Sequence, residues 1–272
     1  MKEIYPFRNI LLQDYRSISD LPAIFRWLYD VHVQDSISRF EPYTTKYCTY
    51  HALPLPERGE EFGLYKAFMT EHHRLIDQNE CRPPEGPPRG VPYDEAYTPD
   101  FMVRTRQPEN APLRNPRWLG SRDGYHPVVL TRVPLFWERD LKGTDRTLES
   151  GANLRWLIIH KYPEGADGEG ESWFLDELLP RLAQYKEVTR ILTSATVYTG
   201  SRGPWRRVSE VWFEDSRVWE RTMEMLEKEL PRPVWSRYPA FPYLAPYEDL
   251  VGMFLCDYPN SDHLTQYRGF KL

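Results

Sequence analysis

The stretch ESWFLDELLPRLAQYKEVTR, Glu171–Arg190, has a counterpart earlier in the same chain, AIFRWLYDVHVQDSISRFEPYTTKY, Ala23–Tyr47. When Trp27 is aligned with Trp173, an apolar residue follows in both copies, and an aspartate stands three positions after each tryptophan. Internal similarity of this kind is the signature of a repeated structural unit, and it is a stronger guide to the fold than local propensity. The sequence therefore predicts two copies of one unit in a single chain.

Each copy of this stretch lies between short runs with β character. Arg8–Tyr15 and Leu154–Tyr162 precede the two copies, while Lys66–Leu75 and Glu210–Trp219 follow them. Short runs rich in apolar, β-branched and aromatic residues are typical of strands. The order of the runs predicts a β-α-β-β-α-β unit in each half.

Local signals place the elements of the first half. Ser19-Asp20 is the predicted cap of a helix whose first turn tolerates Pro22. Strands are predicted at Tyr43–Leu53 and Glu61–Thr70. The next three residues, Glu71-His72-His73, are predicted to open a second helix.

The second half repeats this pattern and adds a C-terminal tail. The predicted elements, in chain order, are a helix at Ser172–Lys186, strands at Ile191–Tyr198 and Arg207–Glu214, a helix at Ser216–Leu230, a final strand at Met253–Cys256 and a polar tail at Asp257–Leu272.

The regular pattern is interrupted from Cys81 to Gly124. This stretch has too many prolines for a helix interior or a central strand, yet its aromatic residues argue against simple disorder. We expect an ordered arm at 81–124 that wraps the other unit or a partner subunit. The predicted domains are 1–145, including this arm, and 146–272, including the tail.

Composition limits the classes of function. The 272 residues are 40% hydrophobic, which allows a well-formed core, and the net charge of -5 gives no general electrostatic reason to bind nucleic acid. No signal peptide and no membrane-spanning segment are visible. The three cysteines are far apart and match neither a disulfide framework nor a metal motif. A cytoplasmic protein with no nucleic-acid or membrane partner is expected.

The strand–helix–strand order and the motif WLYDVH, Trp27–His32, together resemble the dimeric α+β barrel superfamily, and within it the EthD-like group. The resemblance covers most of Arg8–Thr70 and Leu154–Leu230. It implies an α+β fold in which two fused ferredoxin-like units close an antiparallel barrel. It also implies a cavity between sheet and helices that holds an aromatic small molecule.

Three residues are candidates for acid–base catalysis. His32 lies on the part of the pattern that resembles the family, and its counterpart Leu178 suggests one working cavity and one filled by packing. His160 and Asp14 stand thirteen residues before the aligned tryptophans, where an imidazole and a carboxylate could act as base and orienting partner. The alternatives are a hydrogen-bonded His32 at the edge of the core, and rim positions for His160 and Asp14.

Further residues are candidates for binding the substrate. Arg155 could hold a carboxylate or phenolate, although a surface ion pair is the plain alternative. One of two strand faces, carrying either Tyr47 and His51 or Lys46 and Tyr50, is expected to line the cavity. The predicted substrate-binding set is Arg155, Tyr47, Tyr50, His51, His73 and Trp212. The alternatives are that Trp212 is a core residue and that His73 is a solvated residue at a helix start. Nothing in the sequence marks His126 or His263 as functional.

No motif for a nucleotide, nicotinamide, flavin or metal is present in the sequence. We therefore expect neither cofactor nor metal. Together with this absence, the resemblance to the dimeric α+β barrel superfamily implies a lyase step of aromatic catabolism on an aromatic or phenolic substrate (decarboxylation, deformylation or dehydration), carried out by histidine acid–base chemistry. The alternatives are a polyketide-type cyclase or cofactor-free monooxygenase, and a non-catalytic binding protein. The arm makes a homodimer plausible.

Overall fold

A computed structural model describes residues 6–15, 17–33, 37, 44–74, 128–143, 154–197 and 205–264. The predicted Pro-rich arm, 81–124, lies outside the described residues. Its predicted role therefore stays a prediction.

The first half of the chain builds an antiparallel sheet of five strands in the order β10-β2-β3-β1-β4. Its strands are β1 (Phe7–Gln13), β2 (Thr44–His51), β3 (Phe68–Arg74), β4 (Val128–Pro134) and β10 (Ser261–Asp262). The four longer strands come from the first half, and β10 comes from the C-terminal part of the chain.

The second half builds another antiparallel sheet together with β5, an edge strand that precedes residue 145, and the five strands have the order β5-β7-β8-β6-β9. Its strands are β5 (Arg139–Lys142), β6 (Leu154–His160), β7 (Arg190–Ala195), β8 (Arg207–Phe213) and β9 (Leu250–Cys256). The edge strand β5 precedes the four strands that repeat the order seen in the first half.

The two sheets share one strand order. In each sheet the first long strand of the half, β1 or β6, lies between the third and the fourth, and the second lies beyond the third. This is the order of a ferredoxin-like unit, so the predicted α+β fold class is confirmed. The described residues do not join the sheets by a continuous ladder, however, and the predicted barrel is not closed.

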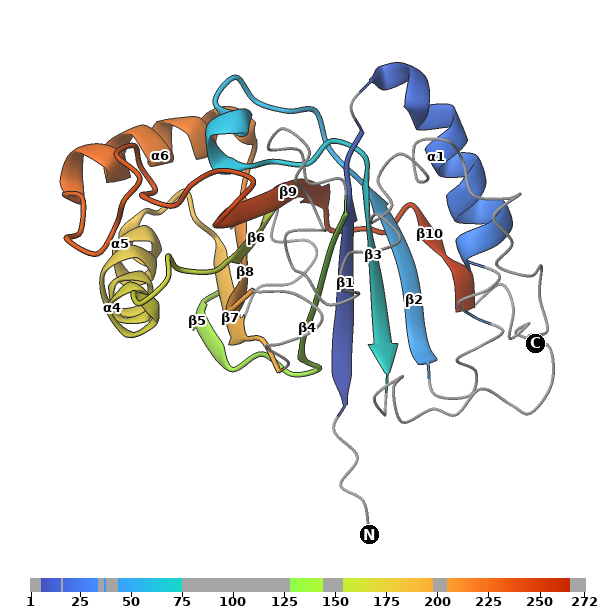
Figure 1. Cartoon of the computed structure of the whole chain (residues 1–272), viewed down its shortest axis with the longest axis horizontal. Coiled ribbons are helices and arrows are strands. Elements are labelled where there is room, and N and C mark those ends of the chain that lie inside the picture. The colour runs from blue at the N-terminus through green and yellow to red at the C-terminus, as the bar shows by residue number, and fades with distance from the viewer. Residues whose placement is uncertain are drawn as a thin grey trace, which may run out of the picture.

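Helices cover the outer face of each sheet, so the two sheets lie between two helical layers (Figure 1). The first half contains η1 (Ile18–Asp20), α1 (Leu21–Trp27), the π-helical η2 (Leu28–His32) and η3 (Gly59–Phe62). The second contains α4 (Asp167–Ser172), the π-helical η7 (Trp173–Leu178), α5 (Leu179–Gln184) and α6 (Ser216–Glu229). None of the helices in these ranges has the length and apolar character needed to cross a lipid bilayer.

Most predicted elements are present, and three need correction. The segment Glu71–His73 belongs to strand β3, which pairs with β1 and β2 on both sides. That pairing outweighs the local capping pattern which suggested a helix. The predicted strand Glu61–Thr70 begins instead with the short helix η3. The predicted polar tail Asp257–Leu272 contains β10 and two buried residues, His263 and Leu264.

The two sheets pack face to face through an apolar core. The first sheet contributes Ile10, Leu12, Cys48, Tyr50, Met69, Val129 and Val133, and the second contributes Leu157, Ile159, Val208, Val251, Met253 and Leu255. Burial of such a surface stabilises the fold by about 25 cal/mol per Å² of apolar area. Each sheet therefore needs the other to cover its inner face.

Backbone hydrogen bonds also connect the sheets at their edges. The N–H of Tyr65 donates to the carbonyl of Gly252, and the N–H of Leu53 donates to that of Phe254, both over 2.8 Å. A side chain at Gly252 would collide with the carbonyl oxygen of Leu157. Leu157 lies in β6, the neighbour of β9 in the second sheet, so glycine at this position permits the close approach of these two strands.

Candidate histidine–tyrosine site

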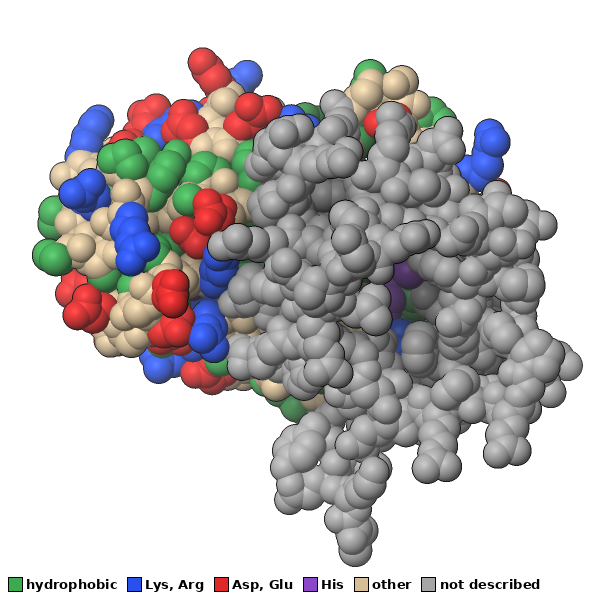
Figure 2. Space-filling view, viewed as in Figure 1, with side chains coloured by type: hydrophobic (Ala, Val, Ile, Leu, Met, Phe, Trp, Pro, Cys, Tyr) green, Lys and Arg blue, Asp and Glu red, His purple; other side chains and the backbone are tan. Residues whose placement is uncertain are grey.

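Four histidines lie on the helix-facing side of the first sheet. We call them, with Tyr29, Tyr47 and Arg74, the histidine cluster: His32 from η2, His51 from β2, His72 from β3 and His263 after β10. Histidine side chains are visible beside cationic ones on the face of the molecule shown in Figure 2.

Strand alternation explains why these residues meet. Tyr47 pairs with His72, and His51 pairs with Phe68, so all four side chains share one face of the sheet. The apolar residues of this face pack against α1 and η2 in a core that includes Ile24, Leu28, Tyr47, Phe68 and Leu264. The polar side chains of the cluster therefore sit at the boundary of an apolar core.

His72 is held as a neutral imidazole by its neighbours. Arg74 Nη2 donates to His72 Nδ1 over 3.3 Å, so the proton of the ring lies on Nε2, which donates to Thr70 Oγ1 over 3.1 Å. Burial, with the nearby charge of Arg74, holds the pKa of His72 well below its usual value. The ring stacks on Tyr47 with centroids 3.9 Å apart. Both nitrogens are engaged, which suits His72 to a positioning role.

His263 enters the cluster from the C-terminal segment. Its Nε2 and the hydroxyl of Thr49 share a hydrogen bond of 2.8 Å, and its ring meets Tyr47 edge-on with centroids 5.4 Å apart. The same ring lies 5.7 Å from that of Tyr29. Burial lowers the pKa of His263, so this imidazole is also neutral at pH 7.

His51 and Tyr29 form a less buried pair at the edge of the cluster. Tyr29 Oη and His51 Nε2 share a hydrogen bond of 2.8 Å, and the ring of Phe25 lies 4.4 Å from the imidazole. Burial lowers the pKa of His51 and raises that of Tyr29. A phenol hydrogen-bonded to a neutral imidazole can exchange a proton with a bound molecule.

His32 closes the cluster from the helical side. Burial, with the positive charge of Arg74, lowers the pKa of His32 to about 4. This residue ends the π-helical segment η2, and its counterpart Leu178 ends η7. Non-α turns of this kind are frequent at functional sites. At neutral pH His32 is a proton acceptor rather than a cation.

The structure brings together three of the residues predicted from sequence, His32, Tyr47 and His51. Sequence reasoning missed four other members: Tyr29, His72, Arg74 and His263. Phe68, His72 and Arg74 are separated by even numbers of residues and therefore lie on one face of a strand, and this period of two was a usable signal. The helix assigned to Glu71–His73 hid that signal. His263 follows a strand of two residues, which is too short to carry a pattern.

Two of the predicted substrate-binding residues, Tyr50 and His73, point from the first sheet to the space between the sheets. There His73 Nε2 contacts the buried carboxylate of Glu71 over 2.6 Å, and Lys46 contacts the same carboxylate over 3.3 Å. Burial alone would raise the pKa of Glu71, but the hydrogen bond from His73 and the charges of Lys46 and Arg8 hold that pKa well below its usual range. The carboxylate of Glu71 is thus paired with cationic neighbours, and this group of residues is separate from the histidine cluster.

Arg155 and Trp212 reach the same inter-sheet space from the second sheet. The guanidinium of Arg155 lies 4.6 Å from the ring centroid of Tyr50 and 3.6 Å from Glu210. The indole of Trp212 donates to Asp257 and packs against Leu192. Arg155 is therefore a buried ion-pair partner rather than the surface ion pair considered from sequence.

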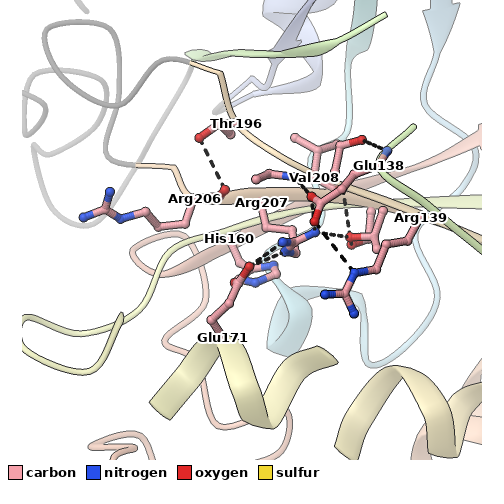
Figure 3. A network of polar contacts seen from close by, with 12 residues as sticks. Glu138, Arg139, His160, Glu171, Thr196, Arg206, Arg207 and Val208 are labelled. Carbon is pink, nitrogen blue, oxygen red and sulfur yellow. Dashed lines mark hydrogen bonds and ion pairs between the residues drawn. The ribbon is translucent and has the colours of Figure 1, made fainter. Parts of the chain in front are cut away.

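His160 belongs to a buried network in the second half (Figure 3). Tyr162 donates its only proton to Glu171 over 2.8 Å, so His160 Nε2 donates to the Tyr162 oxygen over 2.9 Å. Glu171 accepts hydrogen bonds from Arg207, which also bonds Glu138 over 3.2 Å. Burial, with the charge of Arg207, lowers the pKa of His160 to about 3.

Asp14 and His160 are not brought together. The pairing of β1 and β6 with their neighbours aligns Gln13, and not Asp14, with His160. A shift of one residue reverses the face of a strand. Asp14 instead accepts the N–H of Lys66 over 3.0 Å. Burial raises the pKa of Asp14 to about 6.

The second half has an apolar pocket where the first half has the histidine cluster. It lies between the second sheet and its helices and is lined by Leu178 with Trp156, Ile158, Phe174, Leu179, Leu182, Met223, Leu226, Phe241, Pro242, Leu244 and Leu250. Leu178, the counterpart of His32, is thus among apolar side chains. Of the two helix-facing sheet faces, that of the first sheet carries the polar groups needed for acid–base chemistry.

The described residues contain no group of three or more histidine, cysteine or acidic side chains arranged to hold a metal ion. The chemistry available in the histidine cluster is that of neutral imidazoles, phenols and one guanidinium. Such groups can accept a proton and stabilise an anion.

Comparison with known proteins gives one family match. The model described as the chalcone isomerase N-terminal domain matches residues 4–110. This range is less than half of the chain and includes the cluster residues His32, Tyr47, His51 and His72. No curated protein sequence matches the chain.

Solved structures with a similar arrangement are distant in sequence. An anthrone oxidase-like protein is 8% identical, with 81% of this chain and 77% of that chain covered and a TM-score of 0.41. A chlorite dismutase from Candidatus Nitrospira defluvii is 12% identical, with 83% of each chain covered and a TM-score of 0.36. Likenesses at this distance carry no argument about the function of the present chain.

Proposed function

We propose that the chain is an enzyme that binds an aromatic, phenolic small molecule at the histidine cluster and moves a proton within it. The observation that carries the proposal is the grouping of His32 and His72 with Arg74 in a largely buried place. A row of ring contacts along the same sheet face connects this group to His51 through Tyr47, His263 and Tyr29. A neutral imidazole can accept a proton from a bound acid, and a guanidinium stabilises a phenolate or enolate as it forms.

The roles divide by exposure. His51 is partly exposed and suits the part of the base that meets the substrate, whereas the Nε2 atom of His32 is buried, which suits His32 to the interior of the cluster. His72 has both ring nitrogens bonded and holds Arg74 and Tyr47 in place. Aromatic rings at Tyr29 and Phe25 offer a surface on which a substrate ring can stack.

Two reactions are candidates. The first is the lyase step predicted from sequence. In decarboxylation or deformylation the conjugated ring accepts the electron pair left by the departing group, and in dehydration the phenolate ring supplies the electrons that expel water. The second is an isomerisation of a chalcone-like compound, in which proton transfer accompanies ring closure; the family match over residues 4–110 favours it. It lies close to the cyclase alternative considered from sequence.

Several finer predictions belong with this proposal. They are the EthD-like relationship, a tandem origin of the two halves with a division near residue 145, independence of cofactors and metals, a cytoplasmic location and a homodimer. An absorbance spectrum with metal analysis tests the independence of cofactors and metals, and native mass tests the homodimer.

The test uses purified protein with a hydroxychalcone and with a phenolic acid, followed by mass spectrometry of the products. Isomerisation leaves the substrate mass unchanged, decarboxylation removes carbon dioxide, and oxygenation adds oxygen. His72→Gln is expected to lower turnover at least tenfold. His73→Gln, which changes the neighbouring residue on the opposite strand face, is the matched control and retains turnover. Binding of both compounds without any product would leave a non-catalytic binding protein as the function.

A further inference from the structure

The chain after β9 returns to the first sheet and touches the histidine cluster. The N–H of Asn260 donates to the carbonyl of Thr49 over 2.8 Å, and the N–H of His51 donates to Asn260 Oδ1 over 2.7 Å. Ser261 and Asp262 then pair with β2 as strand β10. We call residues 260–264 the C-terminal clip.

We propose that the C-terminal clip completes the histidine cluster and that His263 is a positioning residue of the site, delivered from the other end of the chain. This inference rests on the proposed function for its catalytic meaning, but the docking of the clip is a property of the protein itself. His263 holds Thr49 by a hydrogen bond and meets Tyr47 and Tyr29 with its ring.

The contacts of the clip explain what it positions. The ring of Tyr47 lies between His72, on which it stacks, and His263, which it meets edge-on. Removing His263 leaves one side of Tyr47 without its aromatic neighbour. Tyr29 likewise shares a hydrogen bond with His51 and lies against the ring of His263 of the clip. Two phenols of the cluster therefore take their positions partly from the C-terminal segment.

The clip is held less extensively than the rest of the sheet. Strand β10 pairs with β2 at two positions, whereas β3 pairs with β2 along nearly its whole length. Leu264 anchors the far end in the apolar core beneath α1. Elements with few paired residues open locally at a lower free energy than the global transition. Opening of the clip would uncover Tyr47, which is fully buried when the clip is docked.

The experiment compares Asn260→Ala with Asn260→Asp in the full chain. Asn260→Ala removes the acceptor of the His51 N–H, whereas Asn260→Asp keeps an acceptor oxygen at the same place. We expect hydrogen exchange at the amides of His51 and Asn260 to become about five to ten times faster in the alanine variant, as loss of one hydrogen bond predicts. Exchange in β6 and β8 should not change, and the aspartate variant should resemble the wild type.

A second measurement links docking to the cluster. Side-chain NMR is used to follow the imidazoles of His32, His51 and His72 during a pH titration of wild type, Asn260→Ala and His263→Leu. Undocking lets water reach His51, so its midpoint should rise toward 6.5 in both variants. His263→Gln, which keeps a hydrogen-bonding group for Thr49, should lie nearer to the wild type.

The catalytic part of the inference is tested with 4-nitrophenol as the binding probe and a hydroxychalcone as the trial substrate. His263→Leu should raise KM or weaken 4-nitrophenol binding by at least fivefold, and His263→Gln should recover part of the loss. If wild type neither binds nor converts these compounds, the proposed function fails, while exchange and titration still decide whether the clip docks on the cluster. Unchanged exchange and unchanged titration in Asn260→Ala and His263→Leu would overturn the inference. The inference would also be overturned if hydrogen exchange became faster in these variants while an active enzyme still bound 4-nitrophenol as tightly as the wild type.

Discussion

The phenol ring of Tyr47 and the imidazole of His72 stack with centroids 3.9 Å apart and an angle of 24° between their planes. The two residues are directly paired across strands β2 and β3. Cross-strand aromatic pairs of this kind stabilise a sheet beyond the area they bury. This pair therefore contributes both to the fold and to the geometry of the proposed site.

Replacing Tyr47 by leucine should destabilise the protein by about 1–3 kcal/mol, because the stacked pair and part of the buried area are lost. Tyr47→Phe keeps the ring and should cost less than half as much. Urea unfolding followed by circular dichroism measures the difference. Equal stabilities for the two variants would show that the stack makes no contribution.

The stability of the protein should fall as the pH falls below about 6.5. Burial lowers the pKa values of five histidines: His32, His51, His72, His160 and His263. Below pH 6.5 the folded state therefore binds fewer protons at these side chains than the unfolded chain does. Each such histidine favours folding above its unfolded pKa, and that contribution is lost as the pH falls from the unfolded toward the folded value. Urea unfolding at several pH values between 4 and 7.5 gives the slope. Replacing His160 with phenylalanine should reduce that slope by about one proton.

Asp14 should act in the opposite direction. Burial raises its pKa from the ordinary value of 3.8 to about 6, so it favours folding when protonated and opposes folding as the pH rises through 6. Asp14→Asn keeps the acceptor for the Lys66 N–H and removes the charge. We expect this variant to gain stability relative to the wild type at pH 8, by at most about 3 kcal/mol, and to gain little at pH 4. Thermal unfolding at the two pH values provides the comparison, and an equal gain at both would contradict the explanation.

Arg155 and Glu210 form a buried pair whose members depend on each other. Arg155→Met should destabilise the protein by about 3–5 kcal/mol, because it leaves Glu210 buried without its guanidinium. The double variant Arg155→Met/Glu210→Leu should recover most of this loss. A double-mutant cycle from chemical unfolding measures the coupling, and additive effects of the two changes would disprove the interdependence.

Leu178→His tests the difference between the halves. The pocket around Leu178 is lined by apolar side chains, so a histidine there should cost about 1–3 kcal/mol for burying polar atoms without partners. Leu178→Met is the control and should cost less than about 1.5 kcal/mol. A histidine variant as stable as the control would mean that the second cavity admits polar groups or water.

Much of the fold was predictable because strand order leaves a periodic trace in the sequence. Arg8–Tyr15, Leu154–Tyr162 and Ser216–Leu230 were placed within a few residues of β1, β6 and α6. The wrong prediction concerned a local signal. The polar run Glu71–His73 resembled the start of a helix, but it pairs with a strand on each side and lies in the centre of a sheet. A short stretch of sequence does not show which distant segment it will pair with.

The candidate site was predictable only in part for the same reason. His32 and the Tyr47 face could be chosen from a helix motif and strand alternation. The equivalence of Asp14 and His160 depended on an alignment that differs by one residue from the pairing of their strands, and one residue changes the face. His263 joins the site from more than two hundred positions away in the chain, through its hydrogen bond with Thr49.

Each sheet has an edge strand that comes from the other part of the chain, and this arrangement has a consequence for how the molecule holds together. Strand β5 precedes the second sheet and lies at its edge, while β10 leaves the second half to lie at the edge of the first sheet. A barrel assembled from two separate chains dissociates on dilution, because its association depends on protein concentration. Here the two halves are covalently joined and reach across to each other, so their pairing should survive any dilution. The covalent connection thereby keeps the half that carries the histidine cluster packed against the half that carries the apolar pocket.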